Sequence, residues 1–146
     1  RMDKQISKSV SWEEVSEYIA SGNIAEIAFN ENLTTVSLQL IYGTVRAQKV
    51  VEATFTLLCV NCAYIEIRRS EHHAEGSSVI LEAYLHERST LIEDLLAHKL
   101  AGKSGSLFLE NTCEYLGIKH LEIIGEISLN ILCTEVQIKA VADFPF

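Results

Sequence analysis

The sequence predicts an α+β fold dominated by a mostly antiparallel sheet, curled or arranged as a sandwich, with two short helices packed against it. Three observations predict this class. Apolar and polar residues alternate at period two in segment after segment between residues 24 and 142, which is the pattern of strands with one buried face. Only two segments, beginning near Ser11 and Thr90, change to the spacing of an amphipathic helix. No repeat, low-complexity tract or linker interrupts the pattern, so residues 1–146 are expected to form a single domain.

The first helix and the turns near it follow from local signals. Ser11 and Glu14 form a capping-box pattern, and apolar residues recur at helical spacing from Trp12. A helix is therefore expected over residues 12–20, with Gly22 just past its end. Gly43 is expected to end the second strand, and the residues after it, 44–52, fit either a loop or an exposed strand.

The remaining segments alternate again and contain one more helix. Thr90 and Glu93 form a second capping-box pattern, and leucines at three-and-four spacing extend this helix to about Leu100. A kink or bulge is expected near Asn61, between two strands. The expected strands cover residues 24–29, 34–42, 54–60, 63–68, 78–86, 106–110 and 118–124, and then 127–141 as one or two long strands.

Charge and hydropathy argue against two classes of partner. The net charge is −8, and the 12 Lys and Arg residues form no stripe of the kind that neutralises phosphates. No stretch approaches the roughly 18 apolar residues of a membrane span, and no apolar segment follows the basic N-terminal residues as in a signal peptide. We therefore expect a cytoplasmic protein that binds neither nucleic acid nor membrane. Its acidic surface either keeps it soluble or attracts a basic partner.

The four cysteines are expected to pack in the core. Cys59 and Cys62 form a CxxC motif, but it lies within strand alternation rather than at a helix N-terminus, where the pKa of a thiol is lowered. Cys113 and Cys133 are too far apart to supply the second short-spaced pair of a zinc site. We expect no metal and no cofactor, with the thiols acting as small apolar side chains. Metal or redox chemistry at Cys59 and Cys62 is the alternative.

One polar loop gathers candidate contact residues. Glu71, His72, His73 and Glu75 lie together in it, and Glu31 lies in an earlier turn. Adjacent histidines in an irregular segment need a further ligand to hold a metal, so a solvated loop is the simpler interpretation. Because loops often carry binding, these five residues are nevertheless the ones expected to contact a protein partner.

No arrangement of residues along the chain predicts an enzyme. His86, His98 and His120 are scattered, and none stands at a spacing from a Ser, Cys or Asp that indicates a nucleophile and its base. A competing hypothesis is a small-molecule-binding or enzymatic domain with a cavity lined by His86, His120 or Tyr84. Its mark would be a deep pocket with convergent polar groups. A third hypothesis is a structural homo-oligomer joined through a strand edge within residues 127–141.

Three sequence segments resemble those of a family of small β-rich bacterial proteins. These segments are NIAEIAFNENLTTVSLQL, ATFTLLCVNCAYIEIRR and IIGEISLNILCTEVQIKAV. In this order they resemble the immunity proteins encoded beside contact-dependent toxins, in the family called immunity protein fifty, over about three quarters of the chain from Ile24 onward. The longer N-terminal helix and the helical segment from Leu91 to Leu100 depart from that family. The resemblance implies a cytoplasmic non-enzyme that binds and blocks a cognate toxin, and it carries over no binding residues. The leading expectation is therefore a binding or inhibitory protein whose acidic surface meets a basic partner.

Overall fold

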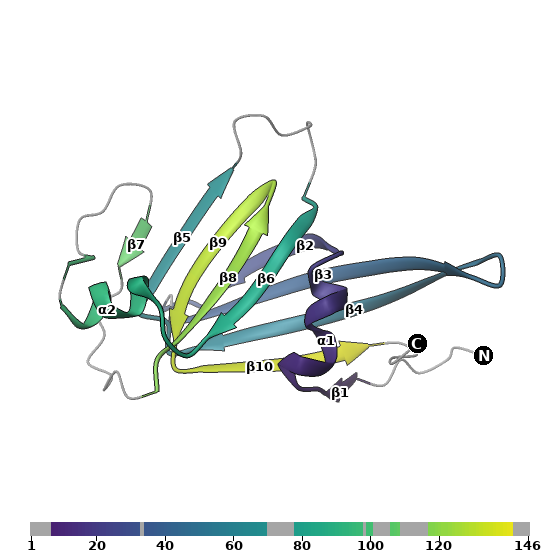
Figure 1. The fold of residues 1–146 in the computed structure, drawn as a ribbon. Helices are drawn as coiled ribbons and strands as arrows, with labels where there is room; N and C mark the ends of the chain where they lie inside the picture. The colour runs from purple at the N-terminus through teal and green to yellow at the C-terminus, as the bar shows by residue number, and fades with distance from the viewer. Residues whose placement is uncertain are drawn as a thin grey trace.

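The alternating segments build two five-stranded antiparallel sheets that pack face to face, which confirms the α+β class (Figure 1). The structure is a computed structural model that describes residues 7–32, 34–69, 78–97, 99–100, 106–108 and 117–141, without the side chains of residues 7, 46 and 106–108. Sheet A contains, in spatial order, β1 (Ser7–Ser9), β10 (Glu135–Val141), β4 (Lys49–Val60), β3 (Thr35–Arg46) and β2 (Asn23–Phe29). Sheet B contains β6 (Ile80–His86), β8 (Lys119–Gly125), β9 (Ile127–Cys133), β5 (Tyr64–Arg69) and β7 (Ser106–Phe108).

The main core lies between the two sheets. Every second residue is buried from Val36 to Leu40 in β3 and from Ala53 to Cys59 in β4, as the period-two pattern predicts. Sheet B contributes Leu121, Ile123 and Ile131 to the same cluster. The outer face of sheet B also buries Tyr64 and Leu132, in a second apolar cluster, and carries polar side chains beside them.

The chain crosses between the two sheets twice at the same corner, from sheet A to sheet B after β4 and from sheet B back to sheet A after β9. The expected kink near Asn61 is confirmed: Asn61 has a φ of 54°, and it separates β4 in sheet A from β5 in sheet B. Residues 127–141 form two strands in different sheets, β9 and β10, separated only by Thr134. The Asn61 side-chain amide donates to Thr134 Oγ1 over 3.2 Å, and the Thr134 N–H donates to the Val60 carbonyl over 3.1 Å. Strands that switch sheets in this way make the corners of a β-sandwich.

Helix α1 (Trp12–Ile19) lies where the two sheets approach each other, against β3 and β6 (Figure 1). The predicted capping box is confirmed, because the Ser11 N–H donates to the Glu14 carboxylate over 2.7 Å and the Glu14 N–H donates to Ser11 Oγ over 3.3 Å. Val15 and Ile19 are buried. The helix therefore closes one side of the core. Within the described residues neither helix is long and apolar enough to cross a membrane.

Helix α2 (Thr90–Leu96) is shorter than predicted, and its N-cap residue lies one position earlier than predicted. The prediction of a Thr90 cap is wrong: Ser89 is the N-cap and accepts a hydrogen bond from the Ile92 N–H over 3.2 Å. The predicted end near Leu100 is also wrong, because Ala97 caps the helix. Leu100 is still buried, in a second cluster under α2 on the outer face of sheet B. Its apolar spacing therefore reflects burial after the helix has ended.

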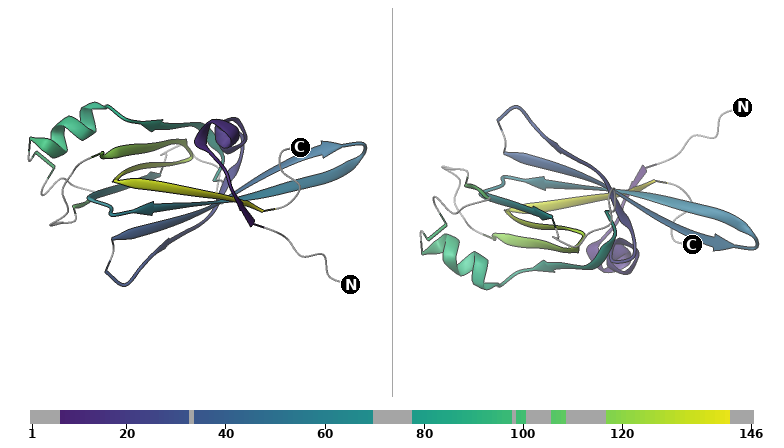
Figure 2. Two further views of the ribbon diagram at one scale, coloured as in Figure 1. Left: turned by 90° about the horizontal axis from the view of Figure 1, so that it is seen from below. Right: turned by 90° about the horizontal axis from the view of Figure 1, so that it is seen from above.

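The prediction that Gly43 ends the second strand is wrong. Strand β3 continues to Arg46 and pairs with β4 up to Lys49, so the ambiguous segment 44–52 is an exposed hairpin. Figure 2 shows this hairpin extending beyond the rest of the two sheets. Its turn is made by Ala47 and Gln48, which both have positive φ, of 48° and 65°. Two positive φ values are typical of the type I′ turn that matches strand twist.

Candidate functional site

The outer face of sheet B carries a row of polar side chains that the strand register brings together. Tyr84 on β6 is opposite Glu122 on β8, Glu122 is opposite Asn130 on β9, and Asn130 is opposite Glu66 on β5. His86 and His120 are opposite each other in the next row, beside α2. Because side chains alternate between faces, all of these residues point away from the main core.

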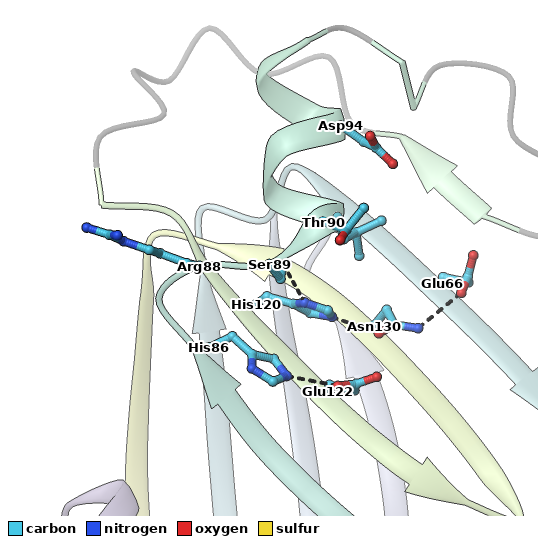
Figure 3. Close-up of a pocket in the computed structure, with 10 residues that line it drawn as sticks. Glu66, His86, Arg88, Ser89, Thr90, Asp94, His120, Glu122 and Asn130 are labelled. Carbon is cyan, nitrogen blue, oxygen red and sulfur yellow. Dashed lines mark hydrogen bonds and ion pairs between the residues drawn. The ribbon is translucent and has the colours of Figure 1, made fainter.

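A pocket of about 510 Å³ lies over this row, beside the first turn of α2 (Figure 3). Its volume is within the range of small-molecule sites, roughly 300 to 1,000 Å³. The lining side chains come from β5, β6, β8, β9, α2 and the segment that leads into α2: Glu66, His86, Arg88, Ser89, Thr90, Leu91, Asp94, His120, Glu122 and Asn130.

A chain of hydrogen bonds crosses the floor of the pocket. Ser89 Oγ is 2.8 Å from His120 Nδ1, and His120 Nε2 is 2.7 Å from Asn130 Oδ1. The Asn130 amide then donates to Glu66 Oε1 over 3.1 Å. Figure 3 shows these side chains following one another from the start of α2 to β5. His120 is 5% exposed and Glu66 is 7% exposed, so the chain is largely withdrawn from water.

The partners of His120 determine where its proton lies. A carboxylate can only accept, so Glu66 fixes the Asn130 amide with its NH₂ toward Glu66 and its Oδ1 toward His120. Since Oδ1 also only accepts, His120 Nε2 carries a hydrogen. Burial lowers the pKa of His120 below its ordinary 6.5, and the nearby His86 acts in the same direction. The hydrogen bond to Asn130 and the charges of Glu122 and Glu66 oppose this shift of the pKa. At neutral pH His120 Nδ1 is therefore bare, and it accepts the Ser89 hydroxyl proton.

Glu66 is the buried anion at the other end of this chain. Burial would raise the pKa of its carboxyl group, but hydrogen bonds from Tyr64, Arg68 and Asn130 outweigh that effect and lower it. The Tyr64 hydroxyl donates to Glu66 Oε2 over 3.0 Å, and the Arg68 guanidinium lies 3.3 Å from the same oxygen. Glu66 is consequently ionised at neutral pH, although its side chain is only 10% exposed.

A second pair extends the polar surface toward the rim. His86 Nε2 lies 2.8 Å from Glu122 Oε1, and both side chains are about one-third exposed. The His86 ring stacks on Tyr84 with centroids 5.4 Å apart and lies 5.1 Å from the His120 ring. Asp94 adds a third carboxylate from α2. Figure 3 shows the one lining guanidinium, that of Arg88, pointing away from these carboxylates. The interior of the pocket is therefore acidic.

The residues predicted to contact a partner do not gather at this pocket. Glu31 lies exposed in the turn between β2 and β3 and is not one of the lining residues. The other four, Glu71, His72, His73 and Glu75, lie outside the described residues. The spacing of residues along the chain indicated no serine partner for a histidine, and the fold brings Ser89 and His120, 31 positions apart, within hydrogen-bond distance.

Of the three residues that the competing hypothesis named as cavity-lining, His86 and His120 line this pocket, and the hypothesis itself stays a prediction. Tyr84 stacks beneath His86 and instead borders a smaller pocket of about 250 Å³ near α1. Sequence reasoning missed Ser89, Asn130 and Glu66, because their convergence depends on strand pairing. The alternation of apolar and polar residues in β5 and β9 places Glu66 and Asn130 on the outer face. This alternation was the only sign in the sequence that the two residues share a face.

The three cysteines that the structure describes occupy the core, as predicted. Cys59, Cys62 and Cys133 are fully buried and form no disulfide, while Cys113 lies outside the described residues. A hydrogen bond with Cys133 and burial raise the pKa of Cys59 well above its ordinary value, and burial raises the pKa of Cys62 to about 12. The thiols of Cys59 and Cys62 therefore stay protonated at neutral pH, which makes them weak nucleophiles. No group of three His, Cys, Asp or Glu side chains within the described ranges is placed to hold a metal ion.

The fold and the pocket together define a two-sheet α+β protein with a polar site on the outer face of one sheet. No protein-family model matches the chain, and no curated protein matches it. It is similar to the crystal structure of an uncharacterized protein from Neisseria gonorrhoeae, with 11% identity, a TM-score of 0.47, and coverage of 91% of this chain and 96% of that chain. At this level of similarity the neighbour adds no argument about function, and the resemblance to the immunity family stays a prediction.

Proposed function

We propose that this protein is a binding protein and that the pocket beside α2 receives a positively charged group. The observation that carries the proposal is the convergence of Glu66, Glu122 and Asp94 on one pocket whose lining contains a single guanidinium, directed away. A cation that enters there meets acceptors at low effective dielectric, where electrostatic attraction exceeds its value in water.

The carboxylates differ in what they offer to a ligand. Both oxygens of Glu66 already accept hydrogen bonds and Arg68 forms an ion pair with one of them, so the carboxylates open to a ligand are those of Glu122 and Asp94. Glu122 uses one oxygen toward His86. Asp94 forms no side-chain hydrogen bond or ion pair within the described part of the chain, so its carboxylate is available at the mouth. A primary amine or guanidinium suits this arrangement because it donates several hydrogen bonds at once.

The same chemistry can come from two sources. A free organic cation would fill the pocket as a small ligand, whereas a basic protein would insert one Lys or Arg side chain. The net charge of −8 would steer either of them toward the protein. The second source agrees with the expectation of an inhibitory protein that binds a basic toxin, and we favour it because the whole surface contributes to the attraction.

Calorimetric titration tests this proposal with two probes, agmatine and the peptide acetyl-Gly-Arg-Gly-amide, at low and moderate salt. We expect at least one of them to bind and the affinity to fall as salt rises. Glu122→Gln combined with Asp94→Asn should weaken binding about tenfold, which corresponds to about 1.4 kcal/mol.

The matched control is Glu82→Gln, which removes an exposed carboxylate from β6 outside the pocket and should leave the affinity unchanged. Binding of the peptide alone would indicate a protein side chain, and equal binding of agmatine would indicate a free cation. Absence of binding by both probes at millimolar concentration and low salt would overturn the proposal.

A further inference from the structure

Ser89, His120 and Asn130 form a serine, a base and a residue that orients the base. The Ser89 hydroxyl lies 2.8 Å from one imidazole nitrogen, and Asn130 Oδ1 lies 2.7 Å from the other. A nucleophile in hydrogen-bond contact with a base, and a base held by a third group, is the geometric signature of covalent catalysis. Ser89 lines a pocket that admits a small molecule.

The hydrogen bonds leave Ser89 with the capacity that a nucleophile needs. Its oxygen accepts the Ile92 N–H over 3.2 Å, and its proton is directed to His120 Nδ1. A hydroxyl oxygen has two lone pairs, so one remains to attack a ligand. Ser89 Oγ can therefore cap helix α2 and act as an activated hydroxyl at the same time.

The geometry points to Ser89 as a nucleophile that accepts the acyl group of a small carboxylic ester in this pocket. The Ser89 oxygen forms a bond to the carbonyl carbon as its proton passes to His120 Nδ1. The ester C–O bond then breaks, and the leaving alcohol takes that proton. Water, activated by His120 in the same way, releases the carboxylic acid and restores Ser89.

The supporting residues have distinct roles in this scheme. Asn130 is a positioning residue, because it holds the hydrogen on His120 Nε2 and leaves Nδ1 bare. Glu66 fixes the Asn130 amide in turn. The titratable groups that line the pocket with His120 are His86 on β6, Arg88 in the segment before α2, Glu122 on β8, Glu66 on β5 and Asp94 on α2. The inference uses the same pocket as the proposed function but does not depend on recognition of a cation.

Covalent labelling with an uncharged alkyl fluorophosphonate tests the inference. Attack by Ser89 forms an O–P bond, fluoride leaves, and the serine proton departs through His120. We expect peptide mapping by mass spectrometry to place the label on Ser89 in preference to every other serine. The labelling rate should rise with pH through a midpoint below 6.5, the ordinary pKa of histidine. Hydrolysis of p-nitrophenyl acetate should follow the same pH profile.

Three variants separate chemistry from folding. Ser89→Asn keeps a good helix cap and should abolish the label while the thermal midpoint stays close to that of the original protein. His120→Gln should slow labelling at least 50-fold. Asn130→Asp places a carboxylate on Nε2, which should move the midpoint of the labelling profile upward. Absence of label on folded protein between pH 6 and 9, or equal labelling of several serines, would overturn the inference. Either result would leave the test of cation binding unaffected.

Discussion

His120 is a buried imidazole whose two ring nitrogens both have polar protein partners, Ser89 and Asn130. Because its folded-state pKa is lowered, the unfolded chain binds an additional proton at this residue below about pH 6.5, the ordinary value. By linkage, stability falls as the pH drops through the ordinary pKa and is retained above it. The pKa of Glu66 is also lowered, so Glu66 contributes in the same direction at lower pH: its stabilisation is present above its ordinary value of 4.5 and is lost as the pH falls through its lowered pKa.

The first prediction follows from these two residues. As the pH falls from 7.5 to 5.5, the urea midpoint of the original protein should decrease. The urea midpoint of the His120→Asn variant should decrease less over the same range, because the variant has no imidazole at this position to protonate on unfolding. The measurement is a urea titration followed by circular dichroism at several pH values. An identical pH dependence in the variant and the original protein would show that His120 does not titrate on unfolding.

At the scale of elements, local signals decide much of the structure, but not all of it. The box formed by Ser11 and Glu14 was predictable because it needs only four consecutive residues. Ser89 was missed as a cap because Thr90 also fits the pattern, and the choice depends on a contact with His120 far along the chain. The hairpin turn was missed because Ala47 and Gln48 lack the Asn-Gly signal that normally accompanies two positive φ values.

Two glycines provide an element-scale prediction with a built-in control. A Cβ on Gly22 would lie 2.7 Å from the carbonyl oxygen of Ile41, where α1 leads into β2 beside β3. Gly22→Ala should therefore destabilise the protein by about 1 to 3 kcal/mol, the usual range for overpacking. Gly43→Ala is the matched control, because its nearest contact would be Glu52 Cγ at 3.9 Å.

Chemical denaturation of the two glycine variants measures the difference directly. The Gly43 variant should stay within about 0.5 kcal/mol of the original protein, as surface substitutions usually do. Equal effects of the two substitutions would contradict the close approach of the chain at Gly22.

At the scale of the whole molecule, period-two alternation predicted the fold class, but it could not predict which strands pair or which face of each sheet is buried. Strands β5 and β9 are neighbours in sheet B although more than fifty residues separate them in sequence. That pairing places Glu66 opposite Asn130, and the pairing of β8 with β9 adds Glu122 to the row. The pairing register of these strands therefore forms the pocket. The sequence alone indicated only that the strand residues of the pocket lie on the polar faces of their strands.

The proposed binding site is the acidic pocket on the outer face of sheet B. The most direct measurement is a two-dimensional amide NMR titration of the full chain with agmatine and with acetyl-Gly-Arg-Gly-amide. We predict saturable shifts concentrated at Ser89, His120, Glu122 and Asn130, with the exposed hairpin tip at Ala47 and Gln48 unchanged. Shifts confined to the hairpin, or spread evenly over the acidic surface without saturation, would contradict the claim.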